Sequence, residues 1–275
     1  MKITCLVEDT SKYKLLEAEH GVSFYVEMEN HKLLFDVGKT DLFLRNAKLL
    51  NIDLTKVDTV IISHGHYDHG GGLLTFMKIN PTAKIYISKY AFRDYYSKRE
   101  EDELAYIGLD QNLKSSKQLI FVENQLKIDQ YLTIFSDVSS QDYYPRGNQT
   151  LYKKIDGKYE NDDFIHEQNL IINEKQNFVL FAGCAHHGIV NIVKKASELL
   201  APQKLTSVLG GFHLSSRFPE LAETEKNIIE ISNILLSYKA MYYTGHCTGI
   251  RQYHILKKYM KDHVDYFSVG FQTTI

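Results

Sequence analysis

The chain has 275 residues, of which 44% are hydrophobic and 24% are charged, an ordinary composition for a soluble globular protein. Its formal net charge of -2 gives no electrostatic reason to expect nucleic acid or an anionic membrane surface as a partner. No stretch approaches the roughly eighteen consecutive apolar residues that a membrane-spanning helix needs. We therefore expect a partner that is a small-molecule substrate, with no nucleic acid and no membrane.

The cysteines and the first residues bear on the compartment. There are three cysteines, Cys5, Cys184 and Cys247, an odd and small number that does not build a disulfide framework and fits a reducing environment. The opening residues, MKITCLVEDT, lack the apolar core of a signal peptide. We expect a cytoplasmic protein.

The first ninety residues predict alternating strands and helices. The run 57–63 is short and almost continuously apolar, which is typical of a strand covered on both faces. Thr40 or Asp41 is available as the N-cap of the first expected helix. The expected strands are 2–9, 23–30, 31–38, 57–63 and 83–88, and the expected helices are 40–51 and 72–80.

The middle of the chain, from about 89 to 163, is rich in Tyr, Lys, Glu and Gln and has weak periodicity. We expect a pair of strands within 119–138 and a hairpin over 151–160 that turns at Asp156 and Gly157. The segment is interpreted as an irregular insertion over one edge of a single domain, 1–275. It could serve as a lid or as a dimer contact, so the formation of a homodimer is left open.

Regular alternation returns in the second half. The expected strands are 169–173, 177–183, 205–211, 240–245 and, as the last strand, 264–270; the expected helices are 188–200, 221–237 and 250–260. Two β-sheets with helices outside suit this order of elements. The sequence predicts an α/β protein with a four-layer αββα sandwich.

The clearest chemical signal is the stretch SHGHYDHGGG, which follows the buried strand expected at 57–63. It places His64, His66, Asp68 and His69 within six residues. Imidazole and carboxylate groups are ligands for Zn, Mn or Fe. Two sets of ligands on one loop indicate two metal ions, and the alternative is a polar loop whose histidines meet water.

Three later strand ends carry further donor residues. Cys184 and His186 lie two residues apart after the strand expected at 177–183, His213 follows 205–211, and His246 follows 240–245. A single histidine at a strand end is more often structural than catalytic. Together, however, these residues supply the distant ligands that a binuclear centre needs.

The pattern H-x-H-x-D-H, preceded by a strand that ends in Asp (LLFDVG) and followed by strand-end histidines, resembles the metallo-β-lactamase superfamily. The resemblance covers nearly the whole chain and implies an αββα sandwich with a binuclear metal centre. It assigns His64 and His66 to the first metal, and Asp68, His69 and His246 to the second. It also makes Asp36 the residue that orients the metal-binding loop.

The remaining histidine of the first metal is where the chain departs from the superfamily pattern. The usual position precedes the strand at 177–183, where the candidate is His166. The motifs GCAHHGIVN, LGGFHL and GHCTG are instead similar to a subfamily that includes 7,8-dihydropterin-6-yl-methyl-4-(β-D-ribofuranosyl)aminobenzene 5'-phosphate synthases. Its G-C-x-H motif favours His186, and His166 stays the alternative. Cys184 falls where the superfamily usually has a bridging Asp, so it is a further candidate ligand.

The resemblance implies two divalent metal ions, Zn first, with Mn or Fe as alternatives. A water held between two cations loses its proton near neutral pH and becomes a nucleophile. Asp68 would orient this nucleophile. His213 is suitably placed to donate a proton to the leaving group or to contact the substrate, and the alternative is that it only packs.

We expect an enzyme, a metal-dependent hydrolase that acts on a phosphorylated or otherwise anionic small molecule. The alternative is a transferase that joins a dihydropterin methyl-diphosphate to an aminobenzene ribotide and releases pyrophosphate. A di-iron redox protein on the same fold is disfavoured because that branch has Glu at the position of His66. A binding module that keeps the site but has lost turnover is the fourth possibility.

Overall fold

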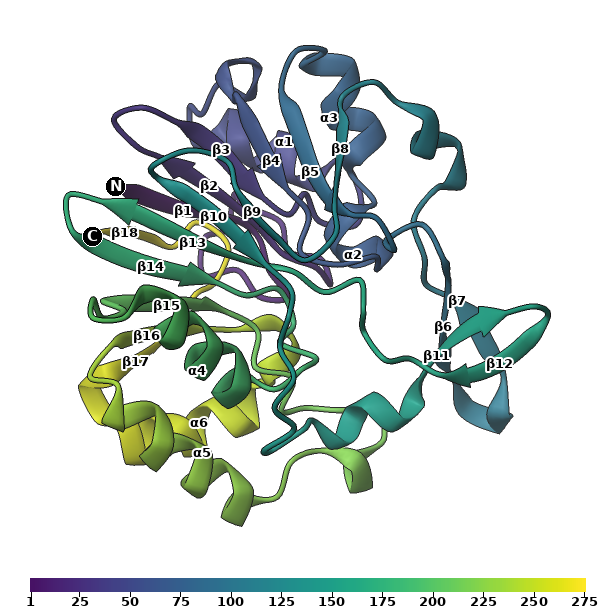
Figure 1. Ribbon diagram of the computed structural model, residues 1–275, viewed down its shortest axis with the longest axis vertical. Helices are drawn as coiled ribbons and strands as arrows, with labels where there is room; N and C mark the ends of the chain where they lie inside the picture. The colour runs from purple at the N-terminus through teal and green to yellow at the C-terminus, as the bar shows by residue number, and fades with distance from the viewer. The chain divides into compact units, whose positions relative to one another are not determined.

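The chain divides into two compact units in the computed structural model, which describes residues 1–275 apart from the side chain of Asp102. The first unit comprises Met1–Glu123, Tyr152–Gln168 and Phe267–Ile275, and the second comprises Asn124–Leu151 and Asn169–Tyr266. Each unit contains a seven-stranded sheet (Figure 1). Within the part of the chain that the structure describes, no helix combines the length and the apolar character that crossing a membrane requires.

The sheet of the first unit is mixed. Its antiparallel part places the two chain ends side by side, because Lys2 pairs with Thr274 and the amino group of Met1 donates to the carbonyl of Ile275 at 2.7 Å (Figure 1). Its parallel part runs from β3 through β4 and β5 to β8. The strands in spatial order are β18 (Gln272–Thr274), β1 (Lys2–Val7), β2 (Ser23–Glu27), β3 (Lys32–Phe35), β4 (Thr59–Ile61), β5 (Lys84–Ser88) and β8 (Leu119–Val122).

Helices cover this sheet with apolar faces at helical spacing. Phe43 and Phe76 are fully buried and belong to one cluster of apolar side chains with Leu34, Val60 and Ile85 of the strands. Burying a side chain of this size contributes about 1.5–3 kcal/mol. The α-helices of the unit are α1 (Leu42–Leu49), α2 (Tyr67–Gly70) and α3 (Leu73–Ile79), and its 3₁₀ helices are η1 (Leu54–Lys56), η2 (Glu100–Asp102) and η3 (Gln111–Ser115).

The sheet of the second unit is parallel over the four strands β14, β15, β16 and β17. Phe181 pairs with Leu209, and Gly210 pairs with Thr244, so the carboxyl ends of three strands lie at the same edge. The strands in spatial order are β17 (Val264–Tyr266), β16 (Met241–Thr244), β15 (Ser207–Gly210), β14 (Asn177–Phe181), β13 (Asn169–Glu174), β10 (Leu132–Phe135) and β9 (Gln125–Lys127).

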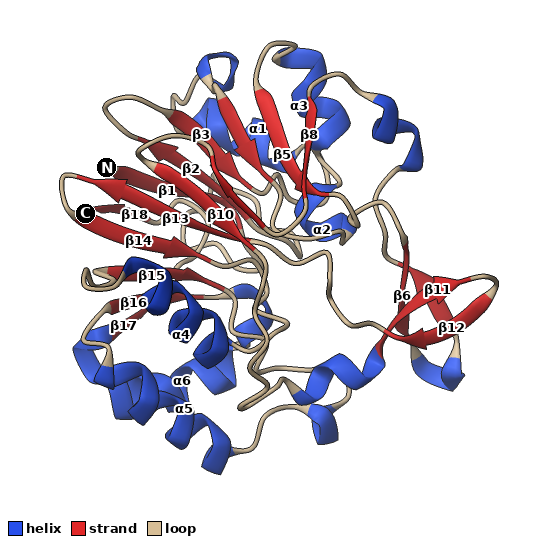
Figure 2. Cartoon of the chain, viewed as in Figure 1, coloured by secondary structure: helices blue, strands red, loops and turns tan.

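Three longer helices pack on this second sheet, as Figure 2 shows in blue. Val193 and Ile228 from two of them share a cluster of buried side chains with Leu180, Val208 and Tyr242 of the strands. The α-helices are α4 (Ile189–Leu200), α5 (Glu225–Ser237) and α6 (Ile250–Met260), and the 3₁₀ helices are η4 (Arg146–Thr150), η5 (Pro219–Leu221), η6 (His246–Thr248) and η7 (Lys261–His263).

A third sheet has four strands, in the order β12 (Lys158–Asn161), β11 (Leu151–Ile155), β6 (Asp94–Lys98) and β7 (Leu104–Tyr106). The hairpin expected over 151–160 is confirmed, since Ile155 pairs with Lys158. Asp156 and Gly157 both have positive φ, 50° and 81°, as the turn of a two-residue hairpin demands.

The structure places the short helix α2 in the expected loop and begins the helix expected over 221–237 at Glu225, and it differs further from the sequence pattern in three places. The strand at 264–270 ends at Tyr266 and is not the last, because β18 follows and pairs with β1. The expected strand pair within 119–138 is three strands, of which β9 and β10 pair, while β8 joins the other sheet beside β5. The segment 89–163 is thus more regular than expected and contributes strands to all three sheets.

Candidate metal centre

Asp36 anchors the predicted metal-binding loop in the first unit. It follows β3, and the loop follows β4, its parallel neighbour, so both begin at the same edge of the sheet. The buried carboxylate of Asp36 accepts hydrogen bonds from the backbone N–H of Ser63, the hydroxyl of Ser63 and Nδ1 of His69, each at 2.7 Å. Asp36 therefore binds both ends of the stretch from 63 to 69.

The same network sets the tautomers of two histidines. His69 donates its Nδ1 proton to the carboxylate of Asp36. The hydroxyl of Ser63 gives its own proton to Asp36, so it accepts from Nδ1 of His64, 2.8 Å away. Both rings then carry their lone pair on Nε2. Metal-ligating histidines have this arrangement, in which the other ring nitrogen donates to a carboxylate or another acceptor.

The four donor residues of the loop converge. The ring centroid of His64 lies 4.6 Å from that of His66 and 4.2 Å from that of His69. Asp68 contributes Oδ2 at 3.8 Å from Nε2 of His69. Two donors that share a cation at bond lengths near 2.1 Å lie about 3–3.5 Å apart, so small side-chain rotations suffice. The donor set fits a divalent metal ion.

Burial keeps His66 in the neutral form that metals bind. The residue is 5% exposed, and burial, followed by the nearby His166, lowers the pKa of His66 to about 3. A neutral imidazole is the ligand form, because a protonated ring has no lone pair to give.

His166, the alternative ligand, is engaged at both ring nitrogens. Its Nδ1 accepts from the backbone N–H of Gly65 at 2.9 Å, and its Nε2 lies 3.0 Å from Oδ2 of Asp162. Since Nδ1 accepts, Nε2 carries the proton and donates to Asp162. Although burial raises the pKa of Asp162, its interaction with His166, through the field of the ring and this hydrogen bond, brings that pKa below the usual value. His166 thus ties the segment after β12 to the loop.

One neighbour of the loop was not found from the sequence. Nε2 of His20 lies 3.4 Å from Oδ2 of Asp68, and Nδ1 of His20 lies 2.9 Å from Oδ2 of Asp9. The backbone approaches closely here, because a Cβ at Gly21 would lie 2.4 Å from the carbonyl oxygen of Asp68. His20 lies before β2 and at no strand end, so the pattern that revealed the other residues passed over it.

The second unit carries the other candidates on three neighbouring loops. These loops follow β14, β15 and β16, whose carboxyl ends lie at one edge of the parallel sheet. The loops are joined by hydrogen bonds, from the N–H of Gly211 to the carbonyl of Gly183 at 2.8 Å and from that of Phe212 to Oγ1 of Thr248 at 2.9 Å. His213 and His246 both have left-handed backbone conformations, with φ of 49° and 51°.

His186 has a partner that mirrors the arrangement in the first unit. Oδ1 of Asn148 accepts from Nδ1 of His186 at 3.0 Å, and Nδ2 of Asn148 donates to the carbonyl of His186 at 2.7 Å. The lone pair of this ring is again on Nε2. The ring of His213 lies against it, with centroids 4.4 Å apart. Asn148 lies in the segment of weak periodicity and gave no signal in the sequence.

Cys184 and His213 are grouped with Cys247, which sequence reasoning did not assign. The sulfur atoms of the two cysteines and a ring nitrogen of the histidine all lie within 4.8 Å of one another. Burial raises the pKa of the Cys247 thiol, but hydrogen bonds with Cys184 and His213 and the charges of His246 and His213 lower it well below its usual value.

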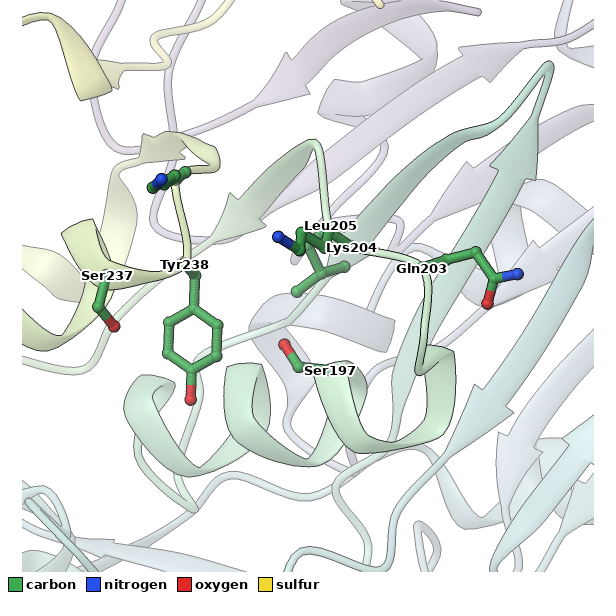
Figure 3. A pocket seen from close by; sticks show the side chains of 7 residues that line it. Ser197, Gln203, Lys204, Leu205, Ser237 and Tyr238 are labelled. Atoms are coloured by element: carbon green, nitrogen blue, oxygen red, sulfur yellow. The ribbon is translucent and has the colours of Figure 1, made fainter.

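A small cavity of about 240 Å³ lies at the opposite end of the same strands (Figure 3). It is lined by residues in and after the last turns of α4 and α5, among them Ser197 and Tyr238, and by Leu205 in the segment between α4 and β15. Leu205 precedes β15, whereas His213 follows it, so the cavity is at the amino end of the strand. It takes no part in the chemistry of the histidines.

Comparison with known proteins places the chain in a family. Residues 16–194, more than half of the chain, match the metallo-beta-lactamase superfamily. The chain therefore belongs to this superfamily, and the expected fold is confirmed.

Several relatives cover nearly the whole chain. The 7,8-dihydropterin-6-methyl-4-(beta-D-ribofuranosyl)-aminobenzene-5'-phosphate synthase of Methanocaldococcus jannaschii is 28% identical over 98% of this chain and 95% of its own length. An uncharacterised protein of the same organism is 31% identical over 90% of this chain and 91% of its own length. The crystal structure of Tm1679, described as a metal-dependent hydrolase of the beta-lactamase superfamily, is 30% identical, with a TM-score of 0.84 and coverage of 100% and 99%.

Proposed function

We propose that the chain is a metal-dependent hydrolase acting on a phosphorylated or otherwise anionic small molecule. The observation that carries the proposal is the network from Asp36 through Ser63 to His64 and His69, which holds the rings in the tautomer that binds metal. Tm1679, 30% identical over the full chain, supports it as a protein described as a metal-dependent hydrolase.

The proposed ligands are the residues that the superfamily pattern assigns. They are His64, His66, Asp68, His69, His186, His246 and, as a further candidate, Cys184. His186 is favoured over His166 because the partner of its Nδ1, Asn148, leaves the lone pair on Nε2, whereas His166 already uses both nitrogens. We propose two divalent ions, Zn first and Mn or Fe as alternatives, for this mixed set of imidazole and carboxylate donors.

Metal ions held by these residues supply positive charge that lowers the pKa of a bound water and stabilises negative charge on the substrate. The chain's own residues contribute the rest. Asp68 is a carboxylate beside His69 and is suited to orient the attacking water. His213, stacked on His186, is suited to give a proton to the leaving group.

A second candidate function joins a dihydropterin methyl-diphosphate to an aminobenzene ribotide: the pterin-methyl group is transferred from its diphosphate, which leaves as pyrophosphate. The synthase from Methanocaldococcus jannaschii, which matches over 98% of this chain, is the finding that favours it. In this reaction the same cations would bind the leaving diphosphate.

A substrate panel separates the two functions. Metal-loaded protein is assayed on a phosphodiester, a phosphomonoester, a carboxylic ester and a lactone, and separately on the dihydropterin diphosphate with and without the aminobenzene ribotide. We expect turnover of an anionic member of the panel, lost in His66→Ala and kept in His254→Ala, a change on the exposed side of α6. Pyrophosphate released only when both transferase substrates are present would instead establish the second function. Activity that persists undiminished in His66→Ala would contradict both.

A further inference from the structure

Three side chains of the second unit form a cluster of sulfur and imidazole donors, and one of them, Cys247, has no part in the proposed function. Cys184, His213 and Cys247 stand on the three loops that follow β14, β15 and β16. Their sulfur and nitrogen donor atoms all lie within 4.8 Å of one another. Cys184 is 4% exposed, and the other two side chains are half-buried, so the group is sheltered but reachable.

Hydrogen bonds to backbone carbonyls hold these loops in place around the cluster. The carbonyl of Cys247 accepts from the N–H of Ser215 at 3.1 Å and from its hydroxyl at 2.8 Å, and the thiol of Cys247 donates to the carbonyl of Cys184 at 3.4 Å. Gly211 leaves room for the sulfur, because a Cβ at this position would lie 2.4 Å from Sγ of Cys247. The loop positions are therefore set before any ligand binds, which lowers the cost of assembling a site.

The donor set matches one class of ligand. Two thiolates and one imidazole are typical of zinc sites, with Zn–S bonds of about 2.3 Å and Zn–N bonds of about 2.0–2.1 Å. Donors at these bond lengths around a tetrahedral ion lie about 3.3–3.8 Å apart. Separations of up to 4.8 Å thus need to contract by at most about 1–1.5 Å, which rotation about the Cα–Cβ bonds of cysteine can supply.

We propose that Cys184, His213 and Cys247 bind a borderline-soft divalent cation of the Zn²⁺ type, with water at the fourth position. This gives Cys184 and Cys247 a joint role. It goes beyond the proposed hydrolase: Cys247 is absent from that ligand set, and here Cys184 and His213 bind this cation in place of the roles of candidate ligand and proton donor given above.

Cobalt titration tests the site directly. Full-length protein is freed of metal with a chelator and titrated with Co²⁺, and the thiolate-to-cobalt charge-transfer absorption in the near ultraviolet is recorded. We expect this absorption in the wild type, about half of it in Cys247→Ser and none in the double variant Cys184→Ser/Cys247→Ser. Cys5→Ser is the matched control, since Cys5 is a buried thiol on β1 of the first unit, and its absorption should equal that of the wild type.

Two results would overturn the proposal. One is the absence of charge-transfer absorption in the wild type, and the other is an absorption that Cys247→Ser leaves unchanged, which would mean that Cys184 binds metal without Cys247. His64→Ala separates this site from the proposed hydrolase centre: it should remove metal from the 64–69 loop while the thiolate absorption stays. If His64→Ala keeps all its metal, the hydrolase centre fails and the thiolate site stands.

A measurement on unmodified protein covers the case in which the serine variants do not fold. Metal-free wild type is treated with an isotope-coded alkylating reagent with and without Zn²⁺, and labelling of each cysteine is counted by mass spectrometry. We expect Zn²⁺ to slow labelling of Cys247 at least tenfold and to leave the rate at Cys5 unchanged. Equal rates at Cys247 with and without Zn²⁺ would refute the site.

Discussion

Replacement of Asp36 tests whether one buried carboxylate organises the loop that carries the histidines. Asp36 is fully buried and accepts hydrogen bonds from the N–H and the hydroxyl of Ser63 and from Nδ1 of His69, each at 2.7 Å. Asp36→Ala leaves all three donors without this acceptor. Hydrogen bonds to a charged group contribute about 1.5–3 kcal/mol each, but the variant also no longer buries a charge. We therefore expect a loss of about 3–5 kcal/mol in the free energy of unfolding.

Asp36→Asn separates the charge from the shape. The amide keeps one acceptor oxygen but turns a second donor toward the existing donors, so we expect a smaller loss of about 1–3 kcal/mol. Backbone strain adds little to the loss of stability in Asp36→Asn, because Asn tolerates the left-handed conformation at this position, where φ is 59°. Ala tolerates it less well, which adds about 1 kcal/mol to the loss in the Ala variant.

The assay is urea unfolding of metal-free protein, because bound metal would stabilise the folded state and obscure the comparison. Asp41→Asn is the matched control: Asp41 is exposed, its side chain makes no capping bond to α1, and its loss should stay within about 0.5 kcal/mol. If the free energy of unfolding of Asp36→Ala also lies within about 0.5 kcal/mol of that of the wild type, the network does not hold the loop and the reasoning is refuted.

Three further predictions rest on single contacts. Asn148→Ala removes the acceptor of His186 Nδ1 and should lower metal affinity about 10- to 100-fold in a chelator competition, whereas an unchanged affinity would exclude His186 as a ligand. Burial lowers the pKa of His66 to about 3, so between about pH 6.5 and 3 the unfolded chain binds the extra proton and the metal-free fold loses stability as the pH falls, by up to about 1.4 kcal/mol per pH unit from this group. His66→Gln should reduce the pH dependence of the free energy of unfolding between about pH 6.5 and 3. An unchanged pH dependence would mean that another group, not His66, takes up the proton on unfolding. Thr224→Ala removes the N-cap of α5, whose hydroxyl accepts from the N–H of Asn227 at 3.2 Å, and should lower the melting temperature through a loss of about 1 kcal/mol while metal content stays constant.

The candidate residues can be predicted from the sequence where local pattern and strand order agree. His64, His66, Asp68 and His69 directly follow a buried strand, and parallel strands bring their carboxyl ends to one edge, so adjacency of Asp36 to this loop could be anticipated. The same rule placed the loops that carry Cys184, His213 and His246 together in the second unit.

What the sequence did not reveal depends on contacts between residues far apart in the chain. The pairing of Lys2 with Thr274 has no local signal, and strand β18 is only three residues long. Asn148 and His20 lie outside any periodic strand end and become informative only when folding brings them to His186 and Asp68. The motif GHCTG predicted a ligand only at His246. It gave no reason to assign a role to Cys247, the next residue.

Metal content measured by elemental analysis tests the central claim most directly. The wild type, His64→Ala and the control His254→Ala are purified without added metal and then dialysed against Zn²⁺. The account predicts at least about two equivalents per chain in the wild type and the control, and a clear fall in His64→Ala, because Nε2 of His64 is a proposed ligand. Wild-type protein that is metal-free and binds none on titration would contradict the metal centre and leave only the fold.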